Sequence, residues 1–231
     1  LGGNDPLIIF DDVDLDTAVT EAINGRIVHA GQACCSSKRF IVQENIYDEF
    51  AGRLAERLKG MKIGDPLDQG SRIGPLIDER AAQRVEEIVD RTVKAGAYCL
   101  CGGRRFDGNF FEPTVLTGVT PAMDIAQNLE VFGPVFPLIK FKTEEQAVAI
   151  ADNCTYGLSS GVISGEIQRA IRVARQLDAG NCTINGTGLY RTHDMPFGGH
   201  RKSGLGTEGL YATLDEFTKT KTYVWKGAAI R

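Results

Sequence analysis

The chain has 231 residues, of which 42% are apolar and 24% are charged, and its formal net charge is −4. This length suffices for one large domain or two small ones, while the nearly balanced charge excludes a strong electrostatic pull toward nucleic acid or anionic membranes. The longest apolar runs, at residues 6–10 and 135–139, are too short to span a bilayer. We therefore expect neither a nucleic-acid nor a membrane partner. No signal peptide is visible at residues 1–3.

The cysteines and histidines predict free thiols rather than a metal centre. Six cysteines stand at positions 34, 35, 99, 101, 154 and 182. Their spacing fits neither a zinc knuckle nor a small disulfide framework, and His193 and His200 have no metal-ligand spacing with cysteines or carboxylates. We therefore expect no metal site. Unpaired cysteines favour a cytoplasmic location, where thiols stay reduced, and thiol chemistry at one of the six is open.

Short β-branched runs alternate with longer helical patterns along the chain. In order, we expect a strand at 6–10, a helix at 14–27, a strand at 38–43, helices at 46–59 and 79–95, strands at 97–101, 111–116 and 135–141, a helix at 143–153, a strand at 158–163, a helix at 167–177 and a strand at 182–184. Asp14 and Thr143 are typical N-caps, and Gly96 is a typical helix stop. This rhythm predicts an α/β fold with an open, twisted, mainly parallel sheet flanked by helices.

Two later segments break the rhythm. Residues 191–209 are rich in glycine and basic side chains and have no period, and such long irregular stretches in compact domains are usually functional or mobile. Residues 218–225, Thr-Lys-Thr-Lys-Thr-Tyr-Val-Trp, have strong β character after the α/β pattern has stopped. We expect them to form a strand that pairs outside its own domain, since strand addition satisfies exposed backbone groups.

The segment Gly31-Gln32-Ala33-Cys34-Cys35-Ser36 lies between a predicted helix and a predicted strand. Such junctions in α/β folds collect active-site groups, and a cysteine there can attack a carbonyl carbon if its thiolate is favoured. The competing interpretation is a buried cysteine that only packs. The residues alone do not choose between Cys34 and Cys35.

Two further segments allow both a functional and a structural interpretation. In Glu130-Val131-Phe132-Gly133-Pro134, the carboxylate suits the two hydroxyls of a ribose and the aromatic ring suits a flat nicotinamide. The alternative is a solvated glutamate and a core phenylalanine before a Gly-Pro turn. In residues 196–204, paired glycines allow close backbone approach, and the basic side chains suit either an acidic substrate or solvent.

Taken together, these segments resemble the aldehyde dehydrogenase superfamily in order and spacing along the chain. The matching motifs are Leu1-Gly2-Gly3-Asn4, Gly31-Gln32-Ala33-Cys34, Glu130-Val131-Phe132-Gly133-Pro134, residues 153–161, and residues 196–199 with 202–204. In the family's nucleophile motif the catalytic cysteine stands two places after the glutamine, which selects Cys34. The overall texture is most similar to that of succinate-semialdehyde dehydrogenases.

The resemblance implies oxidation of an aldehyde with NAD or NADP as cofactor. Cys34 would attack the aldehyde to form a thiohemiacetal, hydride transfer would leave a thioester, and water would release the acid. The resemblance places Leu1, Gly2, Glu130 and Phe132 at the cofactor and Phe197 at the aldehyde entrance.

The resemblance also implies what this chain lacks. The family's general-base glutamate would stand immediately before Leu1, and we expect the N-terminal cofactor-binding half to be absent. We expect a catalytic domain over residues 1–213 and a C-terminal tail over residues 214–231, whose strand would build a homodimer or homotetramer in the full-length parent. The chain alone is predicted not to turn over aldehyde. Two alternatives are a catalytically dead interaction fragment and an enzyme that passes its thioester to coenzyme A.

The substrate and the choice of cofactor stay open. The arginine that some succinate-semialdehyde dehydrogenases place six residues before the nucleophile is Val28 here. Basic residues that could meet a substrate carboxylate instead are Arg26, Arg191, His193, His200 and Arg201. NAD and NADP cannot be distinguished, because the residues that meet the adenosine ribose would lie in the absent half.

Overall fold

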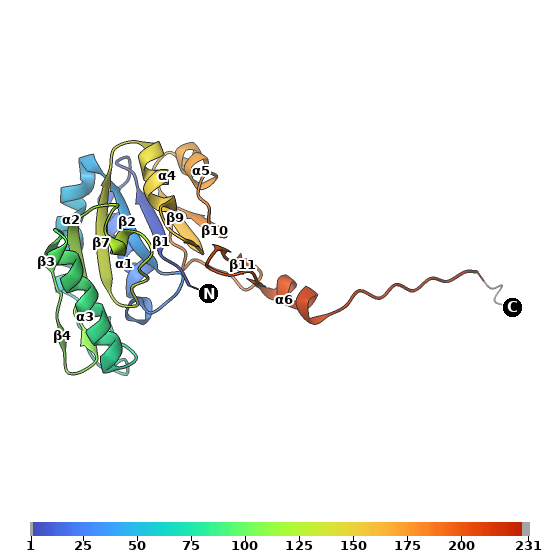
Figure 1. The fold of residues 1–231 in the computed structure, drawn as a ribbon, viewed down its shortest axis with the longest axis horizontal. Coiled ribbons are helices and arrows are strands. Elements are labelled where there is room, and N and C mark those ends of the chain that lie inside the picture. The colour runs from blue at the N-terminus through green and yellow to red at the C-terminus, as the bar shows by residue number, and fades with distance from the viewer. Residues whose placement is uncertain (1, 228–231) are drawn as a thin grey trace.

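A seven-stranded sheet forms the centre of the protein in a computed structural model that describes residues 2–227. In spatial order its strands are β10 (Asn181–Ile184), β9 (Ser159–Ile163), β1 (Asp5–Ile9), β2 (Ser37–Gln43), β7 (Val135–Phe141), β6 (Thr114–Val119) and β3 (Tyr98–Cys101). Every neighbouring pair is parallel except β3 and β6, which are antiparallel. The predicted α/β class with a mainly parallel sheet is confirmed (Figure 1).

Helices flank the sheet in the order that the sequence predicted (Figure 1). They are α1 (Leu15–Ile27), α2 (Glu44–Lys59), α3 (Glu79–Lys94), α4 (Glu144–Asp152) and α5 (Ile167–Ala174); a further helix, α6 (Leu210–Phe217), lies away from the sheet. Helix α1 packs on α2 and β2, α4 packs on β1 and β2, and α5 packs on β9 and β10. The Asp14 carboxylate accepts the Thr17 N–H at 2.8 Å and the Thr143 hydroxyl accepts the Gln146 N–H, so both predicted N-caps are confirmed. No helix within residues 2–227 is long and apolar enough to cross a membrane.

The central strands are buried on both faces, as expected for a parallel sheet between layers of helices. In β1, Leu7, Ile8 and Ile9 are all fully buried although successive side chains point to opposite faces. The same holds for Phe40 and Ile41 in β2. Because its central strands are packed on both faces, the sheet holds the segments that lead into those strands in fixed positions.

Two predicted boundaries differ from the structure. The strand expected at 111–116 is divided: β5 (Phe110–Phe111) pairs with β4 (Arg105–Phe106), and β6 starts only after Pro113. Proline has no backbone N–H to donate to a strand ladder, which explains the break. The segment 191–209, expected to be irregular, contains three two-residue strands. They are β11 (Phe197–Gly198), β12 (His200–Arg201) and β13 (Thr207–Glu208); β11 pairs with β13, and β12 pairs with β8 (Tyr156–Gly157).

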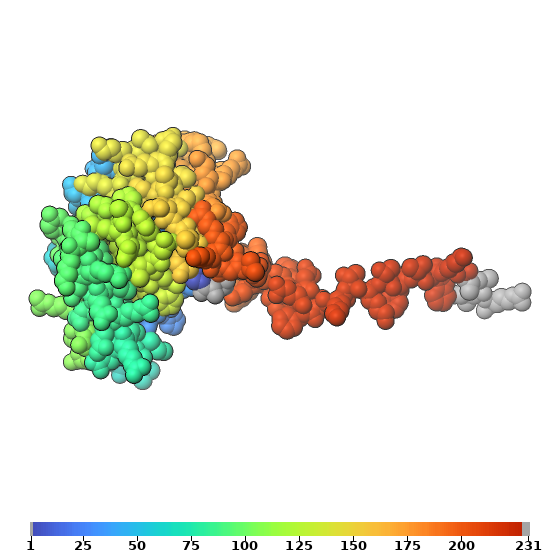
Figure 2. Space-filling model, in the orientation of Figure 1, coloured from blue at the N-terminus to red at the C-terminus, as the bar shows by residue number. Residues whose placement is uncertain are grey.

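The C-terminal part of the described chain projects away from the body of the protein (Figures 1 and 2). The sequence did not predict α6, and residues 218–227 contain neither a helix nor a strand. Large apolar side chains remain exposed along this arm: Leu210, Tyr211, Leu214, Phe217, Tyr223, Val224 and Trp225. A strand that pairs with another domain has no partner in a single chain, so the pairing predicted for 218–225 stays a prediction.

Candidate active site

Three segments that are distant in the sequence meet at one edge of the sheet. Gly3 lies just before β1, Cys34 just before β2, and Glu130 just before β7. Because β1, β2 and β7 are adjacent and parallel, their amino ends lie side by side. Ligand sites in open α/β sheets usually lie at the carboxyl ends of the strands. This candidate site lies at the amino ends, which form the opposite edge of the sheet.

The nucleophile loop, residues 28–36, contains three consecutive residues in the left-handed region. A 3₁₀ turn, η1 (Val28–Gly31), follows α1, and within it φ is 49° at His29, 54° at Ala30 and 80° at Gly31. The left-handed conformation costs a non-glycine residue about 1–2 kcal/mol. Such strain persists only where the surroundings hold it.

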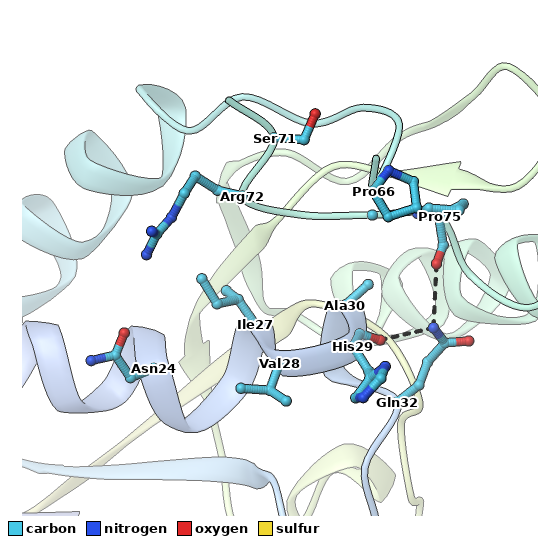
Figure 3. A pocket seen from close by; sticks show the side chains of 11 residues that line it. Asn24, Ile27, Val28, His29, Ala30, Gln32, Pro66, Ser71, Arg72 and Pro75 are labelled. Atoms are coloured by element: carbon cyan, nitrogen blue, oxygen red, sulfur yellow. Dashed lines mark hydrogen bonds between the residues drawn. The ribbon is translucent and has the colours of Figure 1, made fainter. Parts of the chain in front are cut away.

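Gln32 supplies part of that restraint. Its side-chain amide donates to the carbonyl oxygens of His29 at 2.8 Å and Pro75 at 3.4 Å, and its amide oxygen accepts the Ile77 N–H at 2.8 Å. Figure 3 shows this side chain beside a cavity of about 640 Å³ between the end of α1 and the segment that contains Arg72 and Pro75. The loop before Cys34 is therefore fixed to the chain just ahead of α3.

Glycines let the three segments approach one another at backbone distance. Any Cβ on Gly31 would overlap the Gly133 carbonyl, and a Cβ on Gly3 would lie 2.7 Å from the Cys34 carbonyl oxygen. On Gly2 it would lie 3.1 Å from Glu130 Oε2. Glycines thus lie where the three predicted motifs pack most closely against one another.

Glu130 connects two of the segments through one of its oxygens. Its Oε1 atom accepts the Gly3 N–H at 2.8 Å and lies 3.5 Å from Lys38 Nζ, and its side chain is 18% exposed. Within residues 2–227 both contacts use Oε1, which leaves Oε2 available to accept hydrogen bonds from a ligand. This agrees with the acceptor role predicted for Glu130, which stays a prediction.

The thiol of Cys34 is acidic and its neighbour is not. Cys35, as a hydrogen-bond donor, contributes most to lowering the pKa of Cys34 to about 6; partial burial opposes this effect, and the charge of Lys38 supports it. Cys35 holds its proton toward Cys34, so its own pKa is raised, and burial raises it further. With Cys35 as the donor, the thiolate of the pair is on Cys34, the residue that the resemblance selects, and its role as nucleophile stays a prediction.

Asp5 is a buried acid beside the nucleophile loop. Burial raises its pKa to about 7, with Lys38 and Arg39 opposing and Cys34 adding to the shift. Its Oδ2 atom is buried without a hydrogen-bond partner in the described chain. A negative charge on Cys34 disfavours ionisation of the Asp5 carboxyl group, because the two negative charges repel each other.

The two aromatic residues predicted at the site lie in different surroundings. Phe132 is 40% exposed, and Lys38 Nζ lies 5.5 Å from its ring centroid. Phe197 is 2% exposed in β11, with the Arg191 guanidinium 4.2 Å over its ring. The contacts that join Gly3, Lys38 and Glu130 do not include Phe197, so its role at the aldehyde entrance stays a prediction. Leu1, predicted at the cofactor, lies outside the described residues.

The structure removes Arg26 from the basic residues that could meet a substrate carboxylate. Its guanidinium group is fully buried and already donates to backbone carbonyls and to Ser36. His200 and Arg201 both bind the Asp178 carboxylate, and Arg191 pairs with Glu208. The wrong expectation for Arg26 arose because a sequence does not show that an arginine at the end of a helix will turn inward.

A cavity of about 460 Å³ adjoins Glu130 and Phe132 on the side of α3. Arg80 and Arg84 of α3 also line it, and so does Tyr156. The arrangement offers a carboxylate, an aromatic face and positive charge in one space, which suits part of a dinucleotide. No group of three or more His, Cys, Asp or Glu side chains arranged to hold a metal ion occurs within residues 2–227.

Sequence reasoning missed Lys38. It was counted only as the first residue of a strand, whereas its ammonium group lies at the junction of the nucleophile loop and Glu130. The available signal was the pair Lys38-Arg39 at the start of an otherwise apolar strand, because charged residues almost never become fully buried unless they are paired.

Comparison with known proteins agrees with the geometry. The sequence model of the aldehyde dehydrogenase family matches residues 1–223. The chain is 42% identical over 221 residues to glutarate-semialdehyde dehydrogenase of Pseudomonas putida, covering 96% of this chain and 46% of that relative. It is 41% identical over 223 residues to the NADP(+) succinate-semialdehyde dehydrogenase of Escherichia coli, with the same two shares. The chain thus spans about half the length of the curated relatives it matches.

Solved structures of aldehyde dehydrogenases also match most of this chain and about half of their own length. Betaine aldehyde dehydrogenase of Staphylococcus aureus in complex with NAD+ superposes with a TM-score of 0.90 at 39% identity, covering 94% of this chain and 44% of that one. Succinate-semialdehyde dehydrogenase of Burkholderia pseudomallei gives a TM-score of 0.90 at 43% identity, covering 94% and 45%.

Proposed function

This chain belongs to the aldehyde dehydrogenase family, and on that premise we propose that Cys34 is the nucleophile of an NAD- or NADP-dependent oxidation of an aldehyde to a carboxylic acid. The observation that carries the proposal is the acidic Cys34 thiol at the amino edge of the sheet, in backbone contact with the segments that hold Gly3 and Glu130. An acidic thiol gathered with a candidate cofactor site is an arrangement suited to catalysis.

The proposed reaction begins with attack of the Cys34 thiolate on the aldehyde carbon. A C–S bond forms, the carbonyl π electrons move to oxygen, and backbone N–H groups stabilise the resulting oxyanion. Gly2, Glu130 and Phe132 would hold NAD or NADP, which would supply the acceptor for the hydride on the former aldehyde carbon. The product on Cys34 is a thioester, and water releases the acid and regenerates the thiol.

The residues around Cys34 fit the cofactor that this reaction needs. Glu130 Oε2 would accept hydrogen bonds from ribose hydroxyls, and the half-exposed Phe132 ring would restrain a flat heterocycle. The closely packed backbone at Gly2 would let a ligand approach. These assignments make Gly2, Glu130 and Phe132 the cofactor-side residues of this chain.

For the substrate we propose succinate semialdehyde or a similar short aldehyde that carries an acidic group. Support comes from the relatives, whose names include glutarate-semialdehyde, succinate-semialdehyde and sulfoacetaldehyde dehydrogenases. Because those relatives are about twice as long as this chain, we propose that the chain alone does not sustain turnover of aldehyde. Transfer of the thioester to coenzyme A remains the second candidate outcome for the final step.

The acidity of Cys34 can be tested by alkylation. Iodoacetamide is expected to modify Cys34 first among the six cysteines, with a rate that is half-maximal at pH about 6, because only the thiolate reacts. Burial raises the pKa of Cys99, Cys101 and Cys182, so these thiols should react slowly at this pH. The measurement is peptide mass spectrometry after alkylation at a series of pH values.

Cys99 is the internal control, because it is exposed but not acidic. If exposure alone governed the reaction, Cys99 would be modified before Cys34, and the proposed nucleophile would be wrong. That result would instead favour a catalytically dead fragment that serves as an interaction module.

We further propose that the parent protein forms a homodimer or homotetramer through the C-terminal arm. The arm exposes an apolar series from Leu210 to Trp225 that no part of residues 2–227 covers, and large apolar patches mark interaction sites. Replacing Val224 and Trp225 with aspartate should lower the oligomeric state measured by sedimentation. An unchanged assembly would contradict this assignment.

A further inference from the structure

A buried ammonium group connects the nucleophile loop to Glu130. Lys38 has a side chain with 0% exposure. Its Nζ atom donates to the carbonyl oxygens of Ala33 at 2.9 Å, Cys34 at 2.7 Å and Ser36 at 3.3 Å. The same atom lies 3.5 Å from Glu130 Oε1. One cation therefore binds the backbone on both sides of Cys34 and the carboxylate predicted to hold the cofactor.

Placing a lysine here is costly unless its charge is compensated. Transfer of an ammonium group from water to a protein interior costs several kcal/mol per ion, and burial lowers the pKa of Lys38. The compensating negative groups come from three segments: Asp5 at the start of β1, Cys34 in the loop and Glu130 before β7. The positive charge of Arg26 in α1 opposes them.

The charges of Lys38 and Glu130 have opposite effects on the ionisation of Cys34. Glu130 is negative and disfavours a second negative charge on Cys34, whereas Lys38 favours it. Cys35 contributes a hydrogen bond but no positive charge. Lys38 is thus the nearby positive group that allows a carboxylate for the cofactor and a thiolate for the substrate to coexist.

We propose that Lys38 is a positioning residue for the nucleophile: its buried ammonium group holds the loop around Cys34 and the Glu130 carboxylate in one arrangement and stabilises the thiolate against the charge of Glu130. The inference rests on the proposed role of Cys34. It adds a residue that reaches the reacting sulfur only through charge and through the backbone.

The test compares the pH dependence of Cys34 alkylation in the full chain and in the Lys38→Met variant, which keeps a side chain of similar length without the charge. We expect the midpoint to rise by one pH unit or more, so that alkylation at the original midpoint slows by about fivefold or more. At high pH, where every thiol is ionised, the two rates should converge. A purely structural role would lower the rate across the whole range without moving the midpoint.

Two further variants test whether a midpoint shift in Lys38→Met comes from the charge at this position. Glu130→Gln should move the midpoint in the opposite direction, to lower pH, because it removes the negative charge that disfavours the thiolate. Lys140→Met, at an exposed lysine of β7 beside Asp48, should leave the midpoint unchanged. An unchanged midpoint in Lys38→Met, or a shift of equal size in Lys140→Met, overturns the proposal.

A measurement on the unmodified chain applies if Lys38→Met does not fold. A buried cation is screened little by salt, whereas exposed charges are screened strongly. Raising the salt concentration from about 0.05 to 0.5 M should therefore leave the Cys34 midpoint in place; a clear rise would assign the stabilisation to surface charges and overturn the proposal. If Cys34 in the unmodified chain shows no acidic midpoint at all, the proposed function itself fails, which is a different outcome from an unchanged midpoint in the variant.

Discussion

Replacing Cys34 with serine is expected to abolish acylation of this chain by an activated ester. With p-nitrophenyl acetate, the Cys34 thiolate attacks the ester carbonyl, the acetyl group is transferred to Sγ, and p-nitrophenolate leaves, so no cofactor is needed. A serine hydroxyl is not ionised under the same conditions, and we expect the rate of this step to fall by roughly 10⁴-fold or more. The measurement is the initial burst of p-nitrophenolate together with the mass of the acylated chain.

Cys35→Ser is the matched comparison, because the two sulfurs are adjacent in the chain. A serine at position 35 can still donate a hydrogen bond to Cys34, so the burst should persist. Cys99→Ser should behave like the unmodified chain, since Cys99 lies on β3 and its pKa is raised. A burst that survives in Cys34→Ser and disappears in Cys35→Ser would reverse the assignment of the nucleophile.

Local patterns predicted most of the fold because they reflect local causes. Continuous apolar runs such as residues 6–10 become strands that are buried on both faces. Helix ends followed their caps: the Asp14 and Thr143 side chains bond the first turns of α1 and α4, and Gly96 has φ of 110° after α3. Such signals need only neighbours in the sequence, so a single sequence suffices to find them.

The sequence predicted only in part that the three segments of the candidate site lie together. The motifs identified Cys34, Gly2 and Glu130 by resemblance, but their meeting point depends on β1, β2 and β7 being neighbours in the sheet. Strand order is a long-range property, and a periodic pattern does not contain it. The contact between Gly31 and Gly133 is likewise visible only once the two loops are placed together.

Burial of charge was the least predictable feature. Lys38 and Arg39 are consecutive and both fully buried, yet they serve different purposes on opposite faces of the sheet. Lys38 binds the nucleophile loop, whereas Arg39 donates to the carbonyls of Ile150 and Ala151 in α4. A rule that treats lysine and arginine as surface residues fails here because loop carbonyls and helix ends supply the missing partners.

Arg26 is a buried cation whose loss should strongly destabilise the fold. Its Nε atom donates to the Val135 carbonyl, Nη1 donates to Ser36 Oγ, and Nη2 donates to the Val131 carbonyl, each at 2.8 Å. One side chain thereby joins α1 to the entries of both β2 and β7. No hydrogen bond within one of these elements could replace it, because its acceptors belong to two segments that are distant in the sequence.

Arg26→Met is expected to lower the free energy of unfolding by about 3–5 kcal/mol, since each buried polar group left without a partner costs about 1–3 kcal/mol. Urea unfolding followed by circular dichroism measures the change. Arg53→Met is the control: its ion pairs with Asp16 and Glu49 are exposed, and such pairs contribute about 0–1 kcal/mol. Equal losses in the two variants would mean that the bonds of Arg26 are weak. A larger loss in Arg26→Met, with slower alkylation of Cys34 in the folded protein, would show that the same guanidinium group supports both the fold and the loop that presents the nucleophile.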